Sequence, residues 1–80
     1  MTREELLVFI KKEISTESGL KFEAIDENAS FHSLGLDSLS AVLILYNIEK
    51  EFDIELNPIH FWDYPTPATF TDFIIQDCSK

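Results

Sequence analysis

The chain has little of several features that would each indicate a particular class of protein. It contains one cysteine, Cys78, which cannot form an internal disulfide and which we expect to be an inert tail residue. Two glycines and three prolines disfavour a turn-rich β fold. No apolar run reaches the roughly 18 residues of a membrane span, and the N-terminus has acids where a signal peptide has bases. These absences favour a helical protein of the reducing cytoplasm.

Basic residues are also scarce. Six Lys and Arg residues against fifteen Asp and Glu residues give a net charge of −9 at pH 7. Such a surface repels phosphate backbones and anionic lipids, so we expect neither nucleic acid nor membrane as a partner. It would instead speed association with basic partner surfaces. Hydrophobic residues make up 45% of the chain, which is ordinary for a folded protein, and we expect one domain over residues 1–80, acting as a monomer.

Apolar spacing and cap residues predict the first helix and the loop after it. Thr2 and Glu5 form a capping-box pattern, which starts a helix over about 2–16 that Gly19 ends. The stretch 19–37 has no sustained period, but it is too apolar for a flexible linker, so we expect an ordered loop. Its apolar residues, among which Phe31 and Leu34 are the expected anchors, are Leu20, Phe22, Ile25, Ala29, Phe31, Leu34 and Leu36.

The second predicted helix is apolar on two faces. Asp37 or Ser38 is a suitable N-cap, and the helical pattern continues to about residue 52 or 53. One apolar face is expected to enter the core. The other face consists of Leu39, Val42, Leu43 and Tyr46. We expect the first two of these to be partly exposed and to dock partners, whereas the last two either dock as well or pack on the loop and the third helix.

Prolines divide the C-terminal part into a short third helix and a fourth helix. Asn57 and Pro58 start the third helix and Pro65 stops it, while Thr66 caps the fourth helix with Pro67 at its first position. The predicted fold is therefore all-α, a small four-helix bundle of three main helices plus a short third helix. The expected core consists of Leu6, Leu7, Ile10, Ile14, Ile44, Leu45, Ile48, Phe52, Phe70, Phe73 and Ile74.

Ser38, in the sequence GLDSL, is the residue whose chemistry needs an explanation. A hydrolase nucleophile would need a nearby base and a strand–turn–helix elbow with glycines on both sides, and the sequence around Ser38 lacks that pattern. His32 and His60 are isolated, so we expect surface histidines and no metal site. A serine at a helix start is exposed and lies where negative charge is favoured. These properties suit an attachment point for a phosphodiester.

The residues SFHSLGLDSLSAVLILYNIEKEFDIEL resemble the central part of the acyl carrier protein family. LGLDSL at a helix start, Glu51 thirteen residues after Ser38, and DYPT at 63–66 all match the family pattern, and the resemblance covers nearly the whole chain. It implies that Ser38 is esterified with 4′-phosphopantetheine, whose thiol carries acyl groups as thioesters. Asp37 resembles the acid that helps to present this serine, and Leu39 resembles the leucine that partner enzymes contact.

The resemblance also implies what the protein works with. It implies a carrier without catalytic activity, and as partners a phosphopantetheinyl transferase, an acyl- or aminoacyl-loading enzyme, ketosynthase or condensation-type enzymes and a thioesterase. FWDYPT at 61–66 resembles polyketide and nonribosomal peptide carriers more than bacterial fatty-acid carriers. Fatty-acid carriers have acids along the docking face, whereas this chain has Leu43 there and Lys50 later, so we expect apolar, partner-specific docking.

Several alternatives stay open at this stage. Besides an acyl carrier of polyketide, fatty-acid or related secondary-metabolite synthesis, the pattern fits a peptidyl carrier, although peptidyl carriers often have a second glycine where Leu36 stands. An unmodified helical interaction module and a small hydrolase are remote alternatives. Met1 favours a free-standing carrier, and a domain of a larger synthase also fits. We expect Trp62 and Tyr64 to brace the third helix, with a cargo-sheltering space as the alternative for Trp62.

Overall fold

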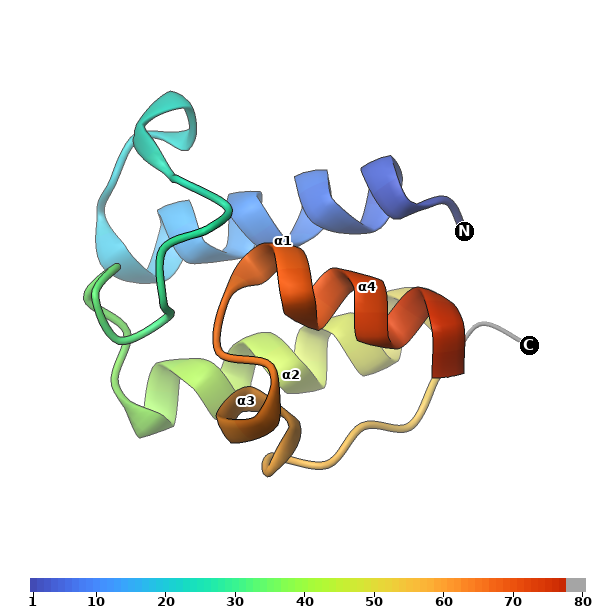
Figure 1. The fold of residues 1–80 in the computed structure, drawn as a ribbon. Helices are drawn as coiled ribbons and strands as arrows, with labels where there is room; N and C mark the ends of the chain where they lie inside the picture. The colour runs from blue at the N-terminus through green and yellow to red at the C-terminus, as the bar shows by residue number, and fades with distance from the viewer. Residues whose placement is uncertain (78–80) are drawn as a thin grey trace.

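The computed structural model describes residues 1–77, and within them it contains α-helices, one 3₁₀ helix and no strand (Figure 1). The main helices are α1 (Arg3–Ser18), α2 (Ser38–Phe52) and α4 (Pro67–Asp77), and α3 (His60–Asp63) is a single turn. The helix α1 packs against both α2 and α4. The predicted all-α bundle with a short third helix is therefore confirmed. Cys78 lies outside the described residues.

Local hydrogen bonds define both ends of α1. The Glu5 backbone N–H donates to Thr2 Oγ1 over 3.1 Å, and the Thr2 N–H donates to Glu5 Oε1 over 3.1 Å, so the predicted capping box is present. Gly19 ends the helix with φ at 80°, a conformation that favours glycine, and its N–H donates to the Ser15 carbonyl. The helix continues two residues beyond the predicted end.

The third helix starts later than predicted, whereas the fourth starts where expected. The Ile59 N–H donates a hydrogen bond to Asn57 Oδ1, which forms a turn over residues 57–59. The α3 helix begins after this turn, at His60, and not at Pro58 as predicted. The α4 helix begins at Pro67, and the Thr69 N–H donates to Thr66 Oγ1 over 3.1 Å. The C-terminal part is therefore one short turn followed by a capped helix.

The predicted core is confirmed except at two aromatic residues. Phe52 and Phe73 are partly buried and pack at its edge. Phe52 is the last residue of α2, and it lies edge-on to the partly buried Phe9 with ring centroids 5.4 Å apart. The predicted core residues that are buried are Leu6, Leu7, Ile10, Ile14, Ile44, Leu45, Ile48, Phe70 and Ile74.

The connection from α1 to α2 is an ordered loop that includes an unpredicted 3₁₀ helix, η1 (Phe22–Ala24). Figure 1 shows it at one end of the bundle, in cyan and green. Leu20 is exposed and does not anchor the loop, because it lies where the chain leaves α1 and before the loop turns back onto the helices. Phe22 and Ala29 are partly buried. The buried anchors, which include both expected ones, are Ile25, Phe31, Leu34 and Leu36.

Two backbone hydrogen bonds tie this loop to the start of α4. The Phe31 N–H donates to the Pro65 carbonyl over 2.8 Å, and the Ala68 N–H donates to the Glu27 carbonyl over 2.9 Å. Both bonds join segments that are far apart in the sequence. Since the loop leads directly into α2, these bonds also place the first residue of α2 relative to α3 and α4.

Candidate functional site

Ser38 is the first residue of α2, and its side chain is exposed to solvent. The preceding residue, Asp37, is the N-cap, and its Oδ1 accepts a hydrogen bond from the Ser40 N–H over 2.8 Å. No hydrogen bond within residues 1–77 involves the Ser38 hydroxyl. The local fold therefore presents a free hydroxyl at the positive end of a helix.

Asp37 has a positioning role that its hydrogen bonds explain. The pKa of its carboxyl is lowered from the ordinary value, chiefly by the hydrogen bond from the Ser40 N–H and next by the Ser40 side chain. The group is thus ionised at neutral pH and a weak base. It holds the first turn of α2 in place, and with it the backbone of Ser38.

A cavity of about 450 Å³ opens beside Ser38. Ser38 and Val42 of α2 contribute to its wall, as do Phe61 and Trp62 of α3, and Phe31 contributes from the loop. Segments that are distant in the sequence thus meet around the candidate attachment residue. The lining is mostly apolar, which is typical of a small-molecule site.

Trp62 differs from its predicted bracing role, because its side chain is 80% exposed. The α3 helix is one turn long, and its residues are partly buried or exposed. The Phe61 ring stacks on Phe70 with centroids 4.7 Å apart, and the ring of Tyr64, the residue after α3, stacks on Phe73 with centroids 4.4 Å apart, so these two residues attach α3 to α4. The bracing role of Tyr64 is therefore confirmed, whereas Trp62 faces outward and lines the cavity.

The second apolar face of α2 is open to solvent along its length. Leu39 is 79% exposed, and Val42, Leu43 and Tyr46 are 46%, 44% and 54% exposed. Within residues 1–77, Leu43 and Tyr46 are therefore exposed, which disfavours the alternative in which they pack on the loop and the third helix. Ile59, just before α3, is a further exposed apolar residue at 55%, and the sequence analysis did not predict its exposure.

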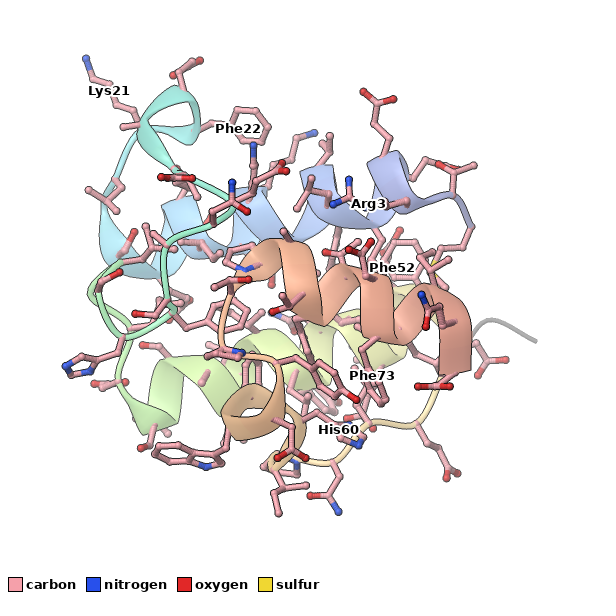
Figure 2. All side chains as sticks on the ribbon, viewed as in Figure 1. Arg3, Lys21, Phe22, Phe52, His60 and Phe73 are labelled. Carbon is pink, nitrogen blue, oxygen red and sulfur yellow. The ribbon has the colours of Figure 1, made fainter. Side chains whose placement is uncertain are left out.

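The two histidines lie apart in the structure. His32 is exposed and lines the cavity, whereas the partly buried His60 ring packs against Phe73 with centroids 4.4 Å apart (Figure 2). Among residues 1–77, no group of three or more His, Cys, Asp or Glu side chains is placed to hold a metal ion. None of the helices in that range has the length and apolarity to span a bilayer.

Comparison of the sequence with models of protein families identifies the family of this chain. The family model described as "Phosphopantetheine attachment site" matches residues 8–74, most of the chain. The chain belongs to the phosphopantetheine-binding carrier proteins. The resemblance inferred from the sequence is thereby confirmed, and the cofactor of this family is phosphopantetheine, which supplies a thiol for thioester formation. The exposed, unbonded hydroxyl of Ser38 fits the attachment of such a group.

Relatives of this carrier protein occur alone and within much larger chains. It is 34% identical over 77 residues to an acyl carrier protein of Cyanidioschyzon merolae, covering 95% of this chain and 85% of that relative. It is also 36% identical over 70 residues to mycoketide-CoA synthase of Mycobacterium tuberculosis and 31% identical over 74 residues to polyketide synthase PksN of Bacillus subtilis. These matches cover 86% and 92% of this chain but only 2% and 1% of the two synthases.

Two solved structures agree with the fold of this carrier protein. A free-standing peptidyl carrier protein from an Acinetobacter baumannii secondary metabolic pathway superposes with a TM-score of 0.87 at 28% identity, covering 94% of both chains. The HMG-ACPI domain of the CurA module from Lyngbya majuscula superposes with a TM-score of 0.83 at 25% identity, covering 94% of this chain and 76% of that one. Proteins named as acyl carriers and proteins named as peptidyl carriers thus share this fold.

Proposed function

We propose that Ser38 bears the 4′-phosphopantetheine arm and that residues 1–80 form a single acyl carrier domain. The arm delivers acyl groups, held as thioesters, to enzymes of polyketide, fatty-acid or related secondary-metabolite synthesis. The single observation that carries this proposal is the exposed Ser38 hydroxyl, free of hydrogen bonds within residues 1–77, at the N-terminus of α2. The positive end of the helix favours the negative charge of a phosphodiester there.

The domain supplies attachment and docking, and the chemistry belongs to its partners. Asp37 caps α2 and holds the serine in position. Partner enzymes bind the exposed face of Leu39, Val42, Leu43 and Tyr46 beside the arm. They comprise a phosphopantetheinyl transferase, a loading enzyme, ketosynthase or condensation-type enzymes and a thioesterase. Because none of these four residues is charged, apolar contact supplies most of the binding, while the net charge of −9 speeds encounter with basic partners.

Intact-mass measurement tests the attachment. Wild type, Ser38→Ala and Ser33→Ala are each incubated with coenzyme A, Mg²⁺ and a broad-specificity phosphopantetheinyl transferase. Ser33 is a matched control, because it is exposed and near in sequence, but its hydroxyl donates to the Ser30 carbonyl over 2.9 Å. We expect a gain of one phosphopantetheinyl group in wild type and Ser33→Ala only. No gain on folded wild type, beside a carrier that is modified in the same tube, would overturn the proposal.

A peptidyl carrier is the second candidate, and the structural similarity to a free-standing peptidyl carrier favours it. The two functions differ in the group that is loaded. The arm-bearing protein is therefore offered, in separate reactions, an acyl-CoA with an acyltransferase and amino acids with ATP and an adenylating enzyme. An acyl thioester in the first reaction alone supports the acyl carrier, and an aminoacyl thioester in the second reaction alone supports the peptidyl carrier.

A further inference from the structure

We propose that the cavity beside Ser38 holds the first part of the prosthetic arm, the branched pantoyl unit with its two methyl groups, and that the indole of Trp62 covers it. This inference rests on the proposed attachment to Ser38. It assigns a binding role to a residue whose side chain is 80% exposed within residues 1–77 and therefore adds little to the packing of the bundle.

The cavity has a few polar lining residues beside the attachment point and is otherwise apolar. Its polar lining residues, His32, Asp37 and Ser38, all come from the loop and the first residue of α2. The α3 helix contributes only Phe61 and Trp62 to the lining. An arm that starts at the Ser38 oxygen therefore begins beside polar residues and then meets hydrocarbon and aromatic side chains. The arm has the same order of polarity, because its phosphate is followed by a carbon that bears two methyl groups.

The cavity is large enough for the pantoyl unit. An apolar cavity of about 150 Å³ holds a benzene molecule. The cavity of about 450 Å³ is open on one side and has ample room for a branched unit of about six carbons. Burying the two methyl groups against Val42 and Trp62 removes apolar surface of both arm and protein from water.

The length of the arm determines which part of it lies in the cavity. The arm has about 14 linked atoms after the serine oxygen, which span roughly 16 Å at the rise of an extended chain. The end of an extended arm therefore lies well away from Ser38. With the pantoyl unit held beside Ser38, the remaining part is free to carry the thiol and its cargo into partner enzymes.

Charge keeps the phosphate itself out of the cavity. The carboxylate of Asp37, which accepts the hydrogen bond from the Ser40 N–H, lies on the residue next to the attachment oxygen. A phosphodiester is favoured by the positive end of α2 but carries the same sign of charge as Asp37, and water screens the repulsion between the two groups. The phosphate therefore faces solvent, and the uncharged carbons that follow it turn toward the apolar wall.

Trp62 reports directly on this contact, because it is the only tryptophan of the chain. Acrylamide quenching of its fluorescence is measured on the unmodified protein, on the arm-bearing protein and on the protein carrying an acetylated or octanoylated arm. We expect the quenching constant to fall about twofold when the arm is attached, because the pantoyl methyl groups shield the indole face. The acetyl and octanoyl groups should change it little further.

Two variants on the exposed side of α2 form a matched pair. Val42 and Leu43 are neighbours with exposures of 46% and 44%, but only Val42 lines the cavity. Val42→Ala should lose most of the protection of Trp62, whereas Leu43→Ala should keep it. Equal quenching before and after an attachment that mass spectrometry verifies would overturn the inference alone. Protection that appears only with the octanoyl group would also overturn it and assign the cavity to cargo. No mass gain would overturn the proposed attachment together with the inference.

Discussion

Phe31 and Pro65 are joined by a backbone hydrogen bond of 2.8 Å between the loop and the turn that precedes α4. The Phe31 ring lies edge-on to the rings of Phe61, at 5.0 Å, and Phe70, at 5.7 Å. One residue thereby connects the loop, α3 and α4, and it also lines the cavity beside Ser38. The geometry around the attachment residue depends on this aromatic cluster.

Replacing Phe31 should therefore destabilise the whole domain. Phe31→Ala removes a buried ring from contact with two others, and we expect the free energy of unfolding to fall by about 3–5 kcal/mol. Urea unfolding followed by far-ultraviolet circular dichroism measures the change. Leu20→Ala is the control, because Leu20 is exposed and should change the free energy by less than about 0.5 kcal/mol. A loss below about 1 kcal/mol in Phe31→Ala would contradict the anchoring role.

Thr71 offers a substitution that should stabilise the protein. It is fully buried in α4, and its hydroxyl has no hydrogen-bond partner within residues 1–77. Thr71→Val puts a methyl group of similar size in its place, and the free energy of unfolding should rise by about 1 kcal/mol. Thermal unfolding should show this as an increase in Tm of roughly 4–8 °C.

The control for this prediction lies two residues earlier in the same helix. Thr69 is exposed, and its hydroxyl pairs with Thr66 Oγ1 over 2.8 Å at the start of α4. Thr69→Val should lower the free energy of unfolding by about 0.5–1 kcal/mol, because it weakens the cap. A lower Tm in both variants would mean that the Thr71 hydroxyl has a polar partner after all.

Two caps should make stability depend on pH in the acidic range. The pKa of Glu5 is lowered chiefly by its side-chain hydrogen bond with Thr2, and the pKa of Asp37 is lowered chiefly by the Ser40 N–H. Since both values lie below those of the unfolded chain, the stabilisation is present above about pH 4 and is lost as the pH falls through the folded-state values.

Substitution separates this effect from general acid denaturation. The free energy of unfolding of wild type and of Asp37→Ala is measured in urea at several pH values between neutrality and the folded-state pKa. We expect the difference between the two proteins to be largest near neutral pH and to shrink as the carboxylate is protonated. If the difference in free energy of unfolding between the two proteins stays constant with pH, the ionised Asp37 carboxylate is not a better cap than the protonated carboxyl.

Leu39 should matter for partners and hardly for stability. Its side chain is 79% exposed, so Leu39→Ala should change the free energy of unfolding by less than about 0.5 kcal/mol. A truncated anchor at the centre of an interface loses more than about 1 kcal/mol, so kcat/KM of the phosphopantetheinyl transferase should fall about tenfold. Leu20→Ala, which is exposed away from α2, should leave that rate unchanged. Equal rates for both variants would refute docking at Leu39.

The sequence by itself determined where the main helices begin and which residue is the candidate attachment point. The caps at Thr2, Asp37 and Thr66 each bond a backbone N–H three residues later, so they depend only on local sequence. LGLDSL and DYPT are likewise contiguous patterns, and together with Glu51 thirteen residues after Ser38 they indicated the carrier family that the comparison confirms. The start of α3 was less predictable, because a proline suits a turn as well as a first helical position.

Only the tertiary structure decided which apolar side chains stay in water. Trp62 and Tyr64 look equivalent in the sequence, yet Tyr64 stacks on Phe73 of α4, while Trp62 has no ring partner among the described residues and is 80% exposed. Leu43 and Tyr46 are exposed for the same reason, since no distant segment within residues 1–77 buries them. Burial is the outcome of contacts between segments far apart in the chain, and helical periodicity within one segment cannot specify them.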